Sequence, residues 1–362
     1  MIKPQKLKSG DRIVAVSLSW GGPGAYPHRY ETGKRQFEEQ FHVQVIESEH
    51  ALRDPEWLSN NPKARADDLM AAFADPKVNG IICTTGGDDS IRTLPFMNLE
   101  VIRRNPKVFM GYSDATITHA ACFKAELVSF YGPGLMSGFA ENGGMFPYLI
   151  DSFSKTVFSD AAVGQLLPNG SGWTDEEVDW GDPAKQAMKR KLQPCSGWKF
   201  HQEGGLSNGI LFGGCVEVLD WLRGTPYWPS LGQLDGAVLF LETSEEAPPP
   251  SMLARFVRSL AAMGVLERLS AILLGRPGGS LDPSQFAKYE DVLVDTVRDE
   301  YGLSGIAIVT NMDFGHTNPL LVIPIGLHAS IDSTFRTIKI DEPAVLSKGQ
   351  QGGAGNVAPL RA

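Results

Sequence analysis

Short apolar runs alternate with amphipathic segments along the first third of the chain. Each apolar run has the length of one buried strand, and together the runs occupy residues 13–18, 43–46, 80–83 and 108–110. Apolar residues recur at helical spacing over residues 30–40 and 64–74, and again after residue 114. This alternation predicts a parallel sheet covered on both faces, with loops and functional sites at the carboxyl ends of its strands.

The pattern changes from residue 132 onward. Loops rich in glycine, proline and asparagine lead into a polar, charged segment that contains three tryptophans, Trp173, Trp180 and Trp198. Further strands are predicted over residues 209–214, 237–241, 271–275, 306–310, 323–326 and 337–340, and helices over residues 251–262 and 283–300. We therefore predict an N-terminal α/β domain over residues 1–165, a crossover over 166–200, a strand-rich α/β domain over 201–346 and a flexible tail over 347–362.

Composition and charge exclude several classes of function. The chain has 362 residues, enough for two domains that each bury a core. Its formal net charge of −9 argues against a nucleic-acid polymer or an anionic membrane as partner. No apolar run has the length of a membrane span or of a signal sequence. Four cysteines without metal-binding spacing predict reduced thiols, so we expect a cytoplasmic protein.

The stretch around Ser113 is the strongest candidate for chemistry. An apolar strand leads into Gly111-Tyr112-Ser113-Asp114-Ala115, and a helix follows. Small residues two positions either side of a serine suit a nucleophile elbow, in which a strand reverses into a helix and exposes the serine hydroxyl. The free N–H groups of that helix then favour a developing oxyanion. Alternatively, Ser113 is a helix N-cap, which is a commoner role for serine.

A glycine-rich loop is expected at the same edge of the sheet. Gly86 and Gly87 follow the predicted strand of residues 80–83, and the carboxyl ends of parallel strands lie together. The N–H group of Gly87 is therefore a candidate oxyanion donor, beside that of Asp114. A plain tight turn is an equally good interpretation of the two glycines.

A serine nucleophile needs a base, and the base usually needs an orienting acid. Among seven histidines, His316 follows a strand and lies in a Gly-His-Thr-Asn-Pro turn that would expose it. Glu242 directly follows the apolar run of residues 237–241, where an imidazole partner offsets the cost of burying a carboxylate. A structural histidine and a solvated carboxylate are the alternatives, and Glu217 is a competing acid. The residues suggest Ser113, Glu242 and His316 as a set, but do not show that they meet.

Cofactor motifs are missing from the sequence. There is no P-loop, no dinucleotide fingerprint and no motif for a metal, so we expect no cofactor. Trp173 and Trp180 are candidates for stacking on a flat ligand, although packing is the commoner role of tryptophan.

The motifs, taken in order, resemble those of the LD-carboxypeptidase and microcin C immunity protein family of serine peptidases. The resemblance covers nearly all of the chain between Leu7 and Glu342. It is carried by Arg65-Ala66-Asp67-Asp68-Leu69, Gly86-Gly87-Asp88-Asp89-Ser90, Gly111-Tyr112-Ser113-Asp114, Leu239-Phe240-Leu241-Glu242, Gly315-His316-Thr317-Asn318-Pro319 and Pro324-Ile325-Gly326.

The resemblance implies a flavodoxin-like N-terminal domain that carries the serine and a C-terminal domain that carries the glutamate and the histidine. The active site would lie at the domain interface, usually in a homodimer and without a cofactor. Ser113 would be the nucleophile, His316 the general base and then acid, and Glu242 the orienting carboxylate. The amides of Gly87 and Asp114 would form the oxyanion hole.

The family divides by substrate. LD-carboxypeptidases remove a terminal D-amino acid from cytoplasmic muropeptides, whereas the immunity branch cleaves the amide between an aminoacyl group and a nucleotide-like moiety. Trp180 and the segment from Trp173 resemble the immunity-type loop whose aromatic side chain stacks on the nucleobase. The resemblance thus implies a small peptide or aminoacyl-nucleotide substrate held by Gly86, Asp88, Trp173 and Trp180. Muropeptide trimming is the alternative function, and a binder that has lost catalysis is the second alternative.

Overall fold

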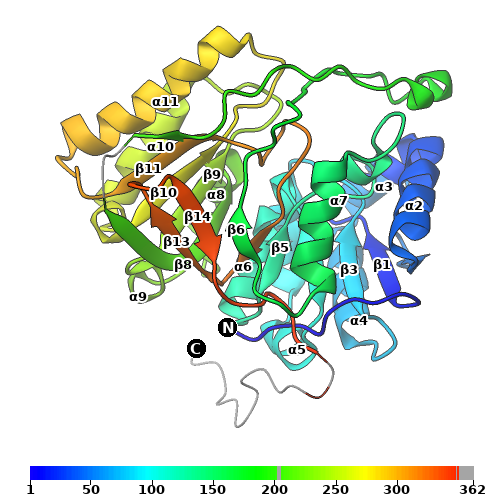
Figure 1. Ribbon diagram of the computed structural model, residues 1–362. Helices are drawn as coiled ribbons and strands as arrows, with labels where there is room; N and C mark the ends of the chain where they lie inside the picture. The colour runs from blue at the N-terminus through cyan, green and yellow to red at the C-terminus, as the bar shows by residue number, and fades with distance from the viewer. Residues whose placement is uncertain (202–204, 348, 350–362) are drawn as a thin grey trace.

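The computed structural model describes residues 1–201, 205–347 and 349, and the strands within these residues form two mixed sheets. The sheets lie beside each other, and residues 166–200 cross over the top of the view in Figure 1. Apart from Ser347 and Gly349, the tail predicted over residues 347–362 lies outside the described residues. Among the residues described, none of the helices combines the length and the hydropathy that a membrane span needs.

The first sheet has the order β12-β5-β4-β3-β1-β2. Its strands are β1 (Arg12–Val16), β2 (Gln44–Glu47), β3 (Gly80–Cys83), β4 (Val108–Gly111), β5 (Ser129–Tyr131) and β12 (Ile323–Ile325). β1 to β5 pair in parallel, and only β12 runs antiparallel to its neighbour, β5. Every residue of β3 and β4 is buried, as expected for strands covered on both faces.

Helices connect and cover these strands. They are α1 (Gly22–Ala25), α2 (Pro27–Phe41), α3 (Pro55–Asn60), α4 (Pro62–Ala74), α5 (Leu99–Arg104), α6 (Thr116–Lys124) and α7 (Pro147–Phe153), the 3₁₀ segments η1 (Ser90–Phe96), η2 (Ser113–Ala115) and η3 (Gly138–Ala140), and the π-helical turn η4 (Ser154–Phe158). Proline begins α2, α3, α4 and α7, where its missing N–H would be unpaired in any case.

The second sheet has the order β6-β14-β13-β8-β9-β10-β11-β7. Its strands are β6 (Gly164–Leu166), β7 (Lys199–Phe200), β8 (Leu206–Cys215), β9 (Val238–Glu242), β10 (Ala271–Gly275), β11 (Ala307–Met312), β13 (His328–Asp332) and β14 (Thr337–Ile340). The four central strands, β8 to β11, are parallel, and the outer strands run antiparallel to their neighbours. Two mixed sheets with intervening helices confirm the predicted α/β class.

The helices of the second half lie mainly on the outer side of this sheet (Figure 1). They are α8 (Val216–Leu222), α9 (Leu231–Leu234), α10 (Pro250–Ala262) and α11 (Phe286–Asp295), the 3₁₀ segments η6 (Leu266–Arg268) and η7 (Pro283–Gln285), and the π-helical turn η8 (Thr296–Glu300). The 3₁₀ segment η5 (Pro183–Ala187) of the crossover packs against α2 instead. The single helix predicted over residues 283–300 is therefore three consecutive segments. The carboxylate of Asp282 accepts the N–H of Ser284 at 2.9 Å and begins the first of them.

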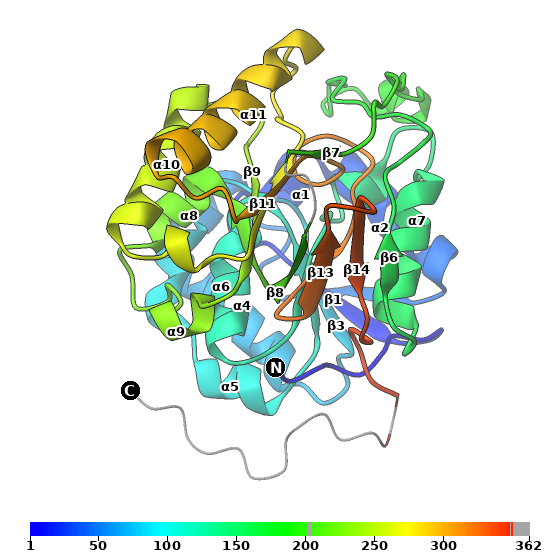
Figure 2. The same ribbon diagram turned by 60° about the vertical axis from the view of Figure 1, so that its left-hand side comes forward.

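Two strands lie in a different sheet from the one that chain order suggests. We predicted that residues 323–326 help to close the second domain, but β12 pairs with β5 of the first sheet. β6, at the end of the predicted first domain, pairs with β14 of the second sheet (Figure 2). The sequence of a short apolar strand does not indicate which strand it pairs with. The sequence alone therefore could not reveal that β12 and β6 each join the sheet of the other half. The division into domains at the predicted boundaries stays a prediction.

The two sheets meet tightly where α6 packs against α8 and β8. A Cβ on Gly214, whose φ is 150°, would lie 2.4 Å from Oγ1 of Thr116. That hydroxyl also accepts the N–H of Cys215 at 3.1 Å. This contact ties the helix that follows Ser113 to the strand beside β9, which carries Glu242, and so links the two halves of the candidate site.

Candidate active site

Ser113 lies at the sharp turn between β4 and α6. Its φ of 60° is in the left-handed region, which a residue with a side chain rarely adopts. The flanks of the turn are crowded, because a Cβ on Gly111 would lie 2.7 Å from that of Ala115. The N-cap positions of η2 and α6 are Tyr112 and Ala115, so Ser113 caps neither helix. The turn has the geometry of a nucleophile elbow.

The loop of Gly86 and Gly87 lies against this serine. A Cβ on Gly86 would lie 3.1 Å from both Cβ and Oγ of Ser113. Gly87 has a φ of 145°, and a Cβ there would lie 2.2 Å from Oγ of Ser19. A side chain at either position would therefore displace the serine or the loop after β1. Gly86 thus brings the backbone of the loop against the serine, and Gly87 lets the loop pack on the loop after β1.

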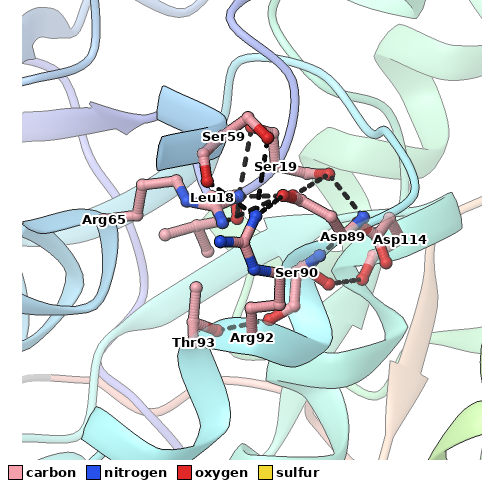
Figure 3. Close-up of polar contacts among 9 residues, drawn as sticks. All are labelled: Leu18, Ser19, Ser59, Arg65, Asp89, Ser90, Arg92, Thr93 and Asp114. Atoms are coloured by element: carbon pink, nitrogen blue, oxygen red, sulfur yellow. Dashed lines mark hydrogen bonds and ion pairs between the residues drawn. The ribbon is translucent and has the colours of Figure 1, made fainter. Parts of the chain in front are cut away.

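An ion pair between a buried arginine and a half-buried aspartate holds the glycine loop in place. Arg65, on α4, is fully buried and donates to both carboxylate oxygens of Asp89, at 2.5 and 3.2 Å. The same guanidinium donates to the carbonyl oxygen of Leu18 at 2.9 Å. Figure 3 shows Arg65, Leu18 and Asp89 together where the loops after β1 and β3 meet. The ion pair therefore fixes the two loops relative to each other.

Ser90 ties the glycine loop to the elbow. Its N–H donates to Oδ2 of Asp114, and its hydroxyl donates to the Asp114 carbonyl oxygen, both at 2.8 Å (Figure 3). Asp114 is fully buried, and burial raises the pKa of its carboxyl group. The Asp114 side chain thus positions the elbow, which leaves its backbone N–H as the group that could contact a substrate.

We expect Arg65→Ala to lower the free energy of unfolding by about 2 kcal/mol. The Leu18 carbonyl oxygen loses its donor, and the half-buried Asp89 carboxylate loses Arg65 but keeps its contact of 3.0 Å with Arg92. A matched control lies on the same helix, where Lys63 and Asp67 form an exposed ion pair of 2.6 Å. Lys63→Ala should cost less than about 1 kcal/mol, since exposed pairs contribute little. Urea unfolding of both variants checks this, and equal losses of stability would contradict it.

Glu242 and His316 form a buried pair at the ends of β9 and β11. Oε2 of Glu242, which is fully buried, lies 2.7 Å from Nδ1 of His316. Gly315 permits this approach, because a Cβ there would lie 2.7 Å from that of Glu242. Burial by itself lowers the pKa of His316, but Glu242 and Glu245 outweigh it and raise that pKa well above its ordinary value.

Tyr131 connects this pair to the elbow. Its hydroxyl donates to Oε1 of Glu242 at 2.5 Å and accepts the N–H of Ser113 at 2.9 Å. Burial and the neighbouring Glu242 raise the pKa of Tyr131 well above its ordinary value, so the hydroxyl keeps its proton. Sequence reasoning missed this residue, because a tyrosine in an apolar strand gives no local sign of such a contact.

We expect Tyr131→Phe to slow modification of Ser113 by a fluorophosphonate about 10- to 100-fold. The change leaves a buried carboxylate oxygen and a buried N–H without a partner, which typically costs about 1–3 kcal/mol. Tyr148→Phe is the control, since that hydroxyl donates only to the carbonyl oxygen of Leu167. Similar labelling rates in the two variants would show that Tyr131 has no positioning role.

The other ring nitrogen of His316 faces an acid. Nε2 lies 2.9 Å from Oε2 of Glu245, an exposed residue of the loop after β9. Within the described residues no hydrogen bond joins Ser113 to His316, but both line one cavity of about 820 Å³. Loops of both sheets and residues 175–180 of the crossover line the same cavity. The structure therefore brings the three predicted residues to one site between the sheets.

The sequence was compared with known families. The profile of the LD-carboxypeptidase N-terminal domain matches residues 13–132, and that of the LD-carboxypeptidase C-terminal domain matches residues 208–331. The putative carboxypeptidase YocD of Bacillus subtilis is 32% identical, over 92% of this chain and 97% of its own. The chain belongs to the LD-carboxypeptidase family. It is therefore an enzyme of the peptidase class.

Solved structures share the fold of this LD-carboxypeptidase family member. The crystal structure of an MccF-like protein from Streptococcus pneumoniae in complex with AMP has a TM-score of 0.83 at 27% identity, covering 92% of this chain and 99% of its own. The microcin C7 self-immunity protein MccF in complex with aspartyl sulfamoyl adenosine also has a TM-score of 0.83 at 27% identity, covering 96% of this chain and 100% of its own.

Trp180 faces the cavity of this family member. The guanidinium of Arg29 lies 4.9 Å from the centre of its ring, and the ring of Tyr26 lies edge-on at 6.3 Å. Nε2 of His28 is 2.6 Å from the Trp180 carbonyl oxygen. The start of α2 thus holds the tryptophan at the cavity, through contacts with Arg29 and His28 that the sequence did not suggest.

Two of the predicted substrate-binding residues lie elsewhere. Trp173 is only 4% exposed and packs between the Phe286 ring, at 5.2 Å, and the Arg276 guanidinium, at 5.0 Å. It is not among the residues that line the cavity, and its surroundings favour packing, the alternative we considered for it. Asp88 is exposed and does not line the cavity either, because its neighbour Asp89 is the residue that turns inward to Arg65.

Buried polar contacts anchor the crossover to the second sheet. Arg276 and Asp313, both fully buried, form an ion pair of 2.9 Å, and the indole N–H of Trp198 donates to Asp313 at 2.8 Å. Thr174 exchanges two backbone hydrogen bonds, of 2.7 and 2.8 Å, with Asn318 in the loop that carries His316. These contacts place the segment with Trp180 beside the loop that carries His316.

A second cluster has the spacing of metal ligands but lies apart from this site. Among the described residues, Glu49, His50 and Asp68 form the group whose ligand atoms approach closely. Both carboxylate oxygens of Asp68 already accept from His50, one from its backbone N–H and one from Nδ1, each at 2.9 Å. These hydrogen bonds explain why the three residues lie together, because they tie the turn after β2 to α4.

Proposed function

We propose that this enzyme hydrolyses the amide of aminoacyl- or peptidyl-nucleotide compounds with a Ser113, Glu242 and His316 triad. The observation that carries the proposal is the cavity that Ser113, His316 and Trp180 line together. Its volume of about 820 Å³ suits a ligand as large as an aminoacyl nucleotide. Arg29 and Trp180 then offer a flat, cationic surface to the nucleotide end, while the elbow receives the acyl end.

The proposed reaction follows from the placement of these groups. Ser113 Oγ attacks the acyl carbon, and Nε2 of His316 takes the hydroxyl proton. Glu242 holds the proton on Nδ1 and so keeps Nε2 directed to the serine. The N–H groups of Gly87 and Asp114 donate to the oxyanion. His316 then protonates the leaving nitrogen, and a water molecule cleaves the acyl-enzyme by the reverse proton transfers.

The comparisons support the part of this proposal that concerns binding of the nucleotide. The S. pneumoniae relative was solved in complex with AMP, and MccF was solved with aspartyl sulfamoyl adenosine. In this chain Trp180 is the aromatic residue of the crossover that faces the cavity. A stacked base could therefore contact this ring of the crossover, with the Arg29 guanidinium beside it.

We expect Trp180→Ala to raise KM for an aminoacyl-sulfamoyl adenosine about 5- to 100-fold, the range that loss of base stacking gives. The value of kcat should change little, because the ring lies away from the reacting bond. Trp221→Ala is the control, since that tryptophan is 39% exposed on α8 and does not line the cavity. Steady-state kinetics measure both, and an unchanged KM in Trp180→Ala would remove the ring from the site.

A hydrolysis assay tests the proposed function. The protein is offered an aminoacyl-sulfamoyl adenosine and an L,D-linked muropeptide tetrapeptide side by side, with Ser113→Ala as the blank. Cleavage of the adenosine compound alone supports the proposal. Release of D-alanine alone would replace it with muropeptide trimming, the alternative that the resemblance implies. Homodimerisation stays a prediction from the resemblance, and a cytoplasmic location stays a prediction from the cysteines.

A further inference from the structure

His316 is held between two carboxylates. Its Nδ1 lies 2.7 Å from Oε2 of Glu242, and its Nε2 lies 2.9 Å from Oε2 of Glu245. An ionised carboxylate only accepts hydrogen bonds, so the ring has to donate from both nitrogens. A ring that donates from both nitrogens carries both protons and a positive charge. In this arrangement Nε2 cannot accept a proton from Ser113.

The titratable groups around the ring all favour this state. Glu242 faces it from the end of β9, Glu245 from the following loop and the Tyr112 ring from the elbow, with ring centres 5.0 Å apart. These groups keep the pKa of His316 well above its ordinary value despite burial. Glu242 is fully buried and bonded to Tyr131, whereas Glu245 is exposed, so Glu245 is the carboxylate that can move away.

The backbone that carries Glu245 is well fixed. The N–H of Ser244 donates to Oε1 of Glu217 at 2.9 Å. The Glu245 carbonyl packs on Gly279, where a Cβ would lie only 2.7 Å from that oxygen. The loop therefore presents the Glu245 carboxylate at one place on the cavity wall, and the side chain alone is free to turn.

We propose that Glu245 binds the free α-ammonium group of an aminoacyl substrate and thereby releases Nε2 of His316 to act as the base. This inference rests on the proposed function, because it assigns the acyl half of the substrate at the same site. The ammonium replaces the imidazolium as the partner of Glu245. The proton on Nε2 passes to solvent as this pairing forms, and the neutral nitrogen then faces the hydroxyl of Ser113.

The chemistry of the acyl group fits this position. A reacting carbonyl carbon lies about 3 Å from the serine oxygen and close to Nε2, and the α-nitrogen is two covalent bonds from that carbon. It therefore falls within reach of a carboxylate that already contacts Nε2. In a peptidyl substrate this nitrogen is acylated and uncharged, so the inference predicts slower turnover of peptidyl compounds than of aminoacyl compounds at the same site. Acidic residues of the crossover, Asp175 and Asp179 among them, also line the cavity and favour a cationic ligand.

A pair of substrates that differ only in this group tests the proposal. Alanyl-sulfamoyl adenosine carries the α-ammonium, and propionyl-sulfamoyl adenosine lacks it. The wild-type protein should favour the alanyl compound about 10- to 100-fold in kcat/KM, as expected for a charge-assisted contact. Glu245→Gln should lose most of this preference. Glu246→Gln is the matched control, an adjacent exposed glutamate outside the cavity lining, and should retain it.

The second measurement does not depend on the substrate. The rate at which a fluorophosphonate modifies Ser113 should rise with pH as His316 loses its second proton. Removing the Glu245 charge makes that proton easier to lose, so the midpoint should move to lower pH in Glu245→Gln and stay in place in Glu246→Gln. An unchanged midpoint in Glu245→Gln, or an unchanged preference for the alanyl compound, overturns the role of Glu245.

The two measurements also separate this inference from the proposed function. The wild-type protein could cleave neither adenosine compound while Ser113 is still labelled. The proposal of a nucleotide substrate would then be wrong, and so would the proposal that Glu245 binds the α-ammonium group of that substrate. If Ser113 is not labelled at any pH, the triad itself is wrong. A shifted midpoint with equal turnover of both compounds would keep the contact with His316 but overturn recognition of the ammonium.

Discussion

Ser113→Ala should abolish hydrolysis and leave ligand binding nearly unchanged. Removing the nucleophile of a serine hydrolase lowers kcat by roughly 10⁴- to 10⁶-fold. Within the part of the chain that the structure describes, the Ser113 hydroxyl makes no hydrogen bond that supports the fold. The contacts of the elbow come from the Ser113 N–H to Tyr131 and from its carbonyl to Thr116. The free energy of unfolding of Ser113→Ala should therefore change little. The loss of activity then comes from the chemical step and not from unfolding.

Two measurements on the same preparation check this prediction. Single-turnover hydrolysis of an aminoacyl-sulfamoyl adenosine reports the chemical step, and titration calorimetry with AMP reports binding. Residual hydrolysis within tenfold of the wild-type rate would mean that another group attacks the substrate. Equal binding by both proteins, with hydrolysis by neither, would favour a small-molecule binder that has lost catalysis.

Glu242→Gln should lower kcat about 10³- to 10⁴-fold while the fold and the binding of ligand are retained. The amide oxygen can still accept the Tyr131 hydroxyl, which now donates to Oε1 of Glu242. The amide nitrogen then faces Nδ1 of His316 and donates to it. This reverses the hydrogen bond, moves the ring proton to Nε2 and leaves the histidine in the wrong tautomer to accept the serine proton.

The control for this variant is a carboxylate buried elsewhere. Glu290 is 5% exposed and pairs with Lys199 at 2.8 Å, outside the cavity lining. Glu290→Gln should keep kcat within about threefold of wild type, because it touches none of the reacting groups. The dependence of kcat on pH completes the test, since a lowered kcat with an unchanged profile would mean that Glu242 does not act through His316.

Local sequence predicted those parts of the site that depend on local geometry. The elbow needs small residues near the serine because one turn brings their backbones together, and Gly111 and Ala115 meet that need within five residues. The same holds for Gly86 and Gly87, which leave no space for a side chain beside Ser113 and Ser19. Steric limits of this kind act between near neighbours, so they leave a pattern that can be recognised along the chain.

Contacts between distant segments left no such pattern. Tyr131 lies 111 residues from Glu242 and bonds to it, and Arg65 lies 24 residues from Asp89. Nothing in the neighbouring residues distinguishes them from an ordinary core tyrosine or helix arginine. The two tryptophans make the same point, because Trp173 is buried by Phe286 and Arg276 while Trp180 faces the cavity.

The sequence by itself determined the alternation of strands and helices, the glycine loop, the elbow and the residues from which a triad could be drawn. These depend on periodicity and on backbone sterics, which act over a few residues. Only the tertiary structure decided that β12 and β6 exchange sheets, that Tyr131 joins the elbow to Glu242 and that Glu245 contacts Nε2 of His316. Those features arise where loops of two sheets pack together, and packing is set by the whole chain.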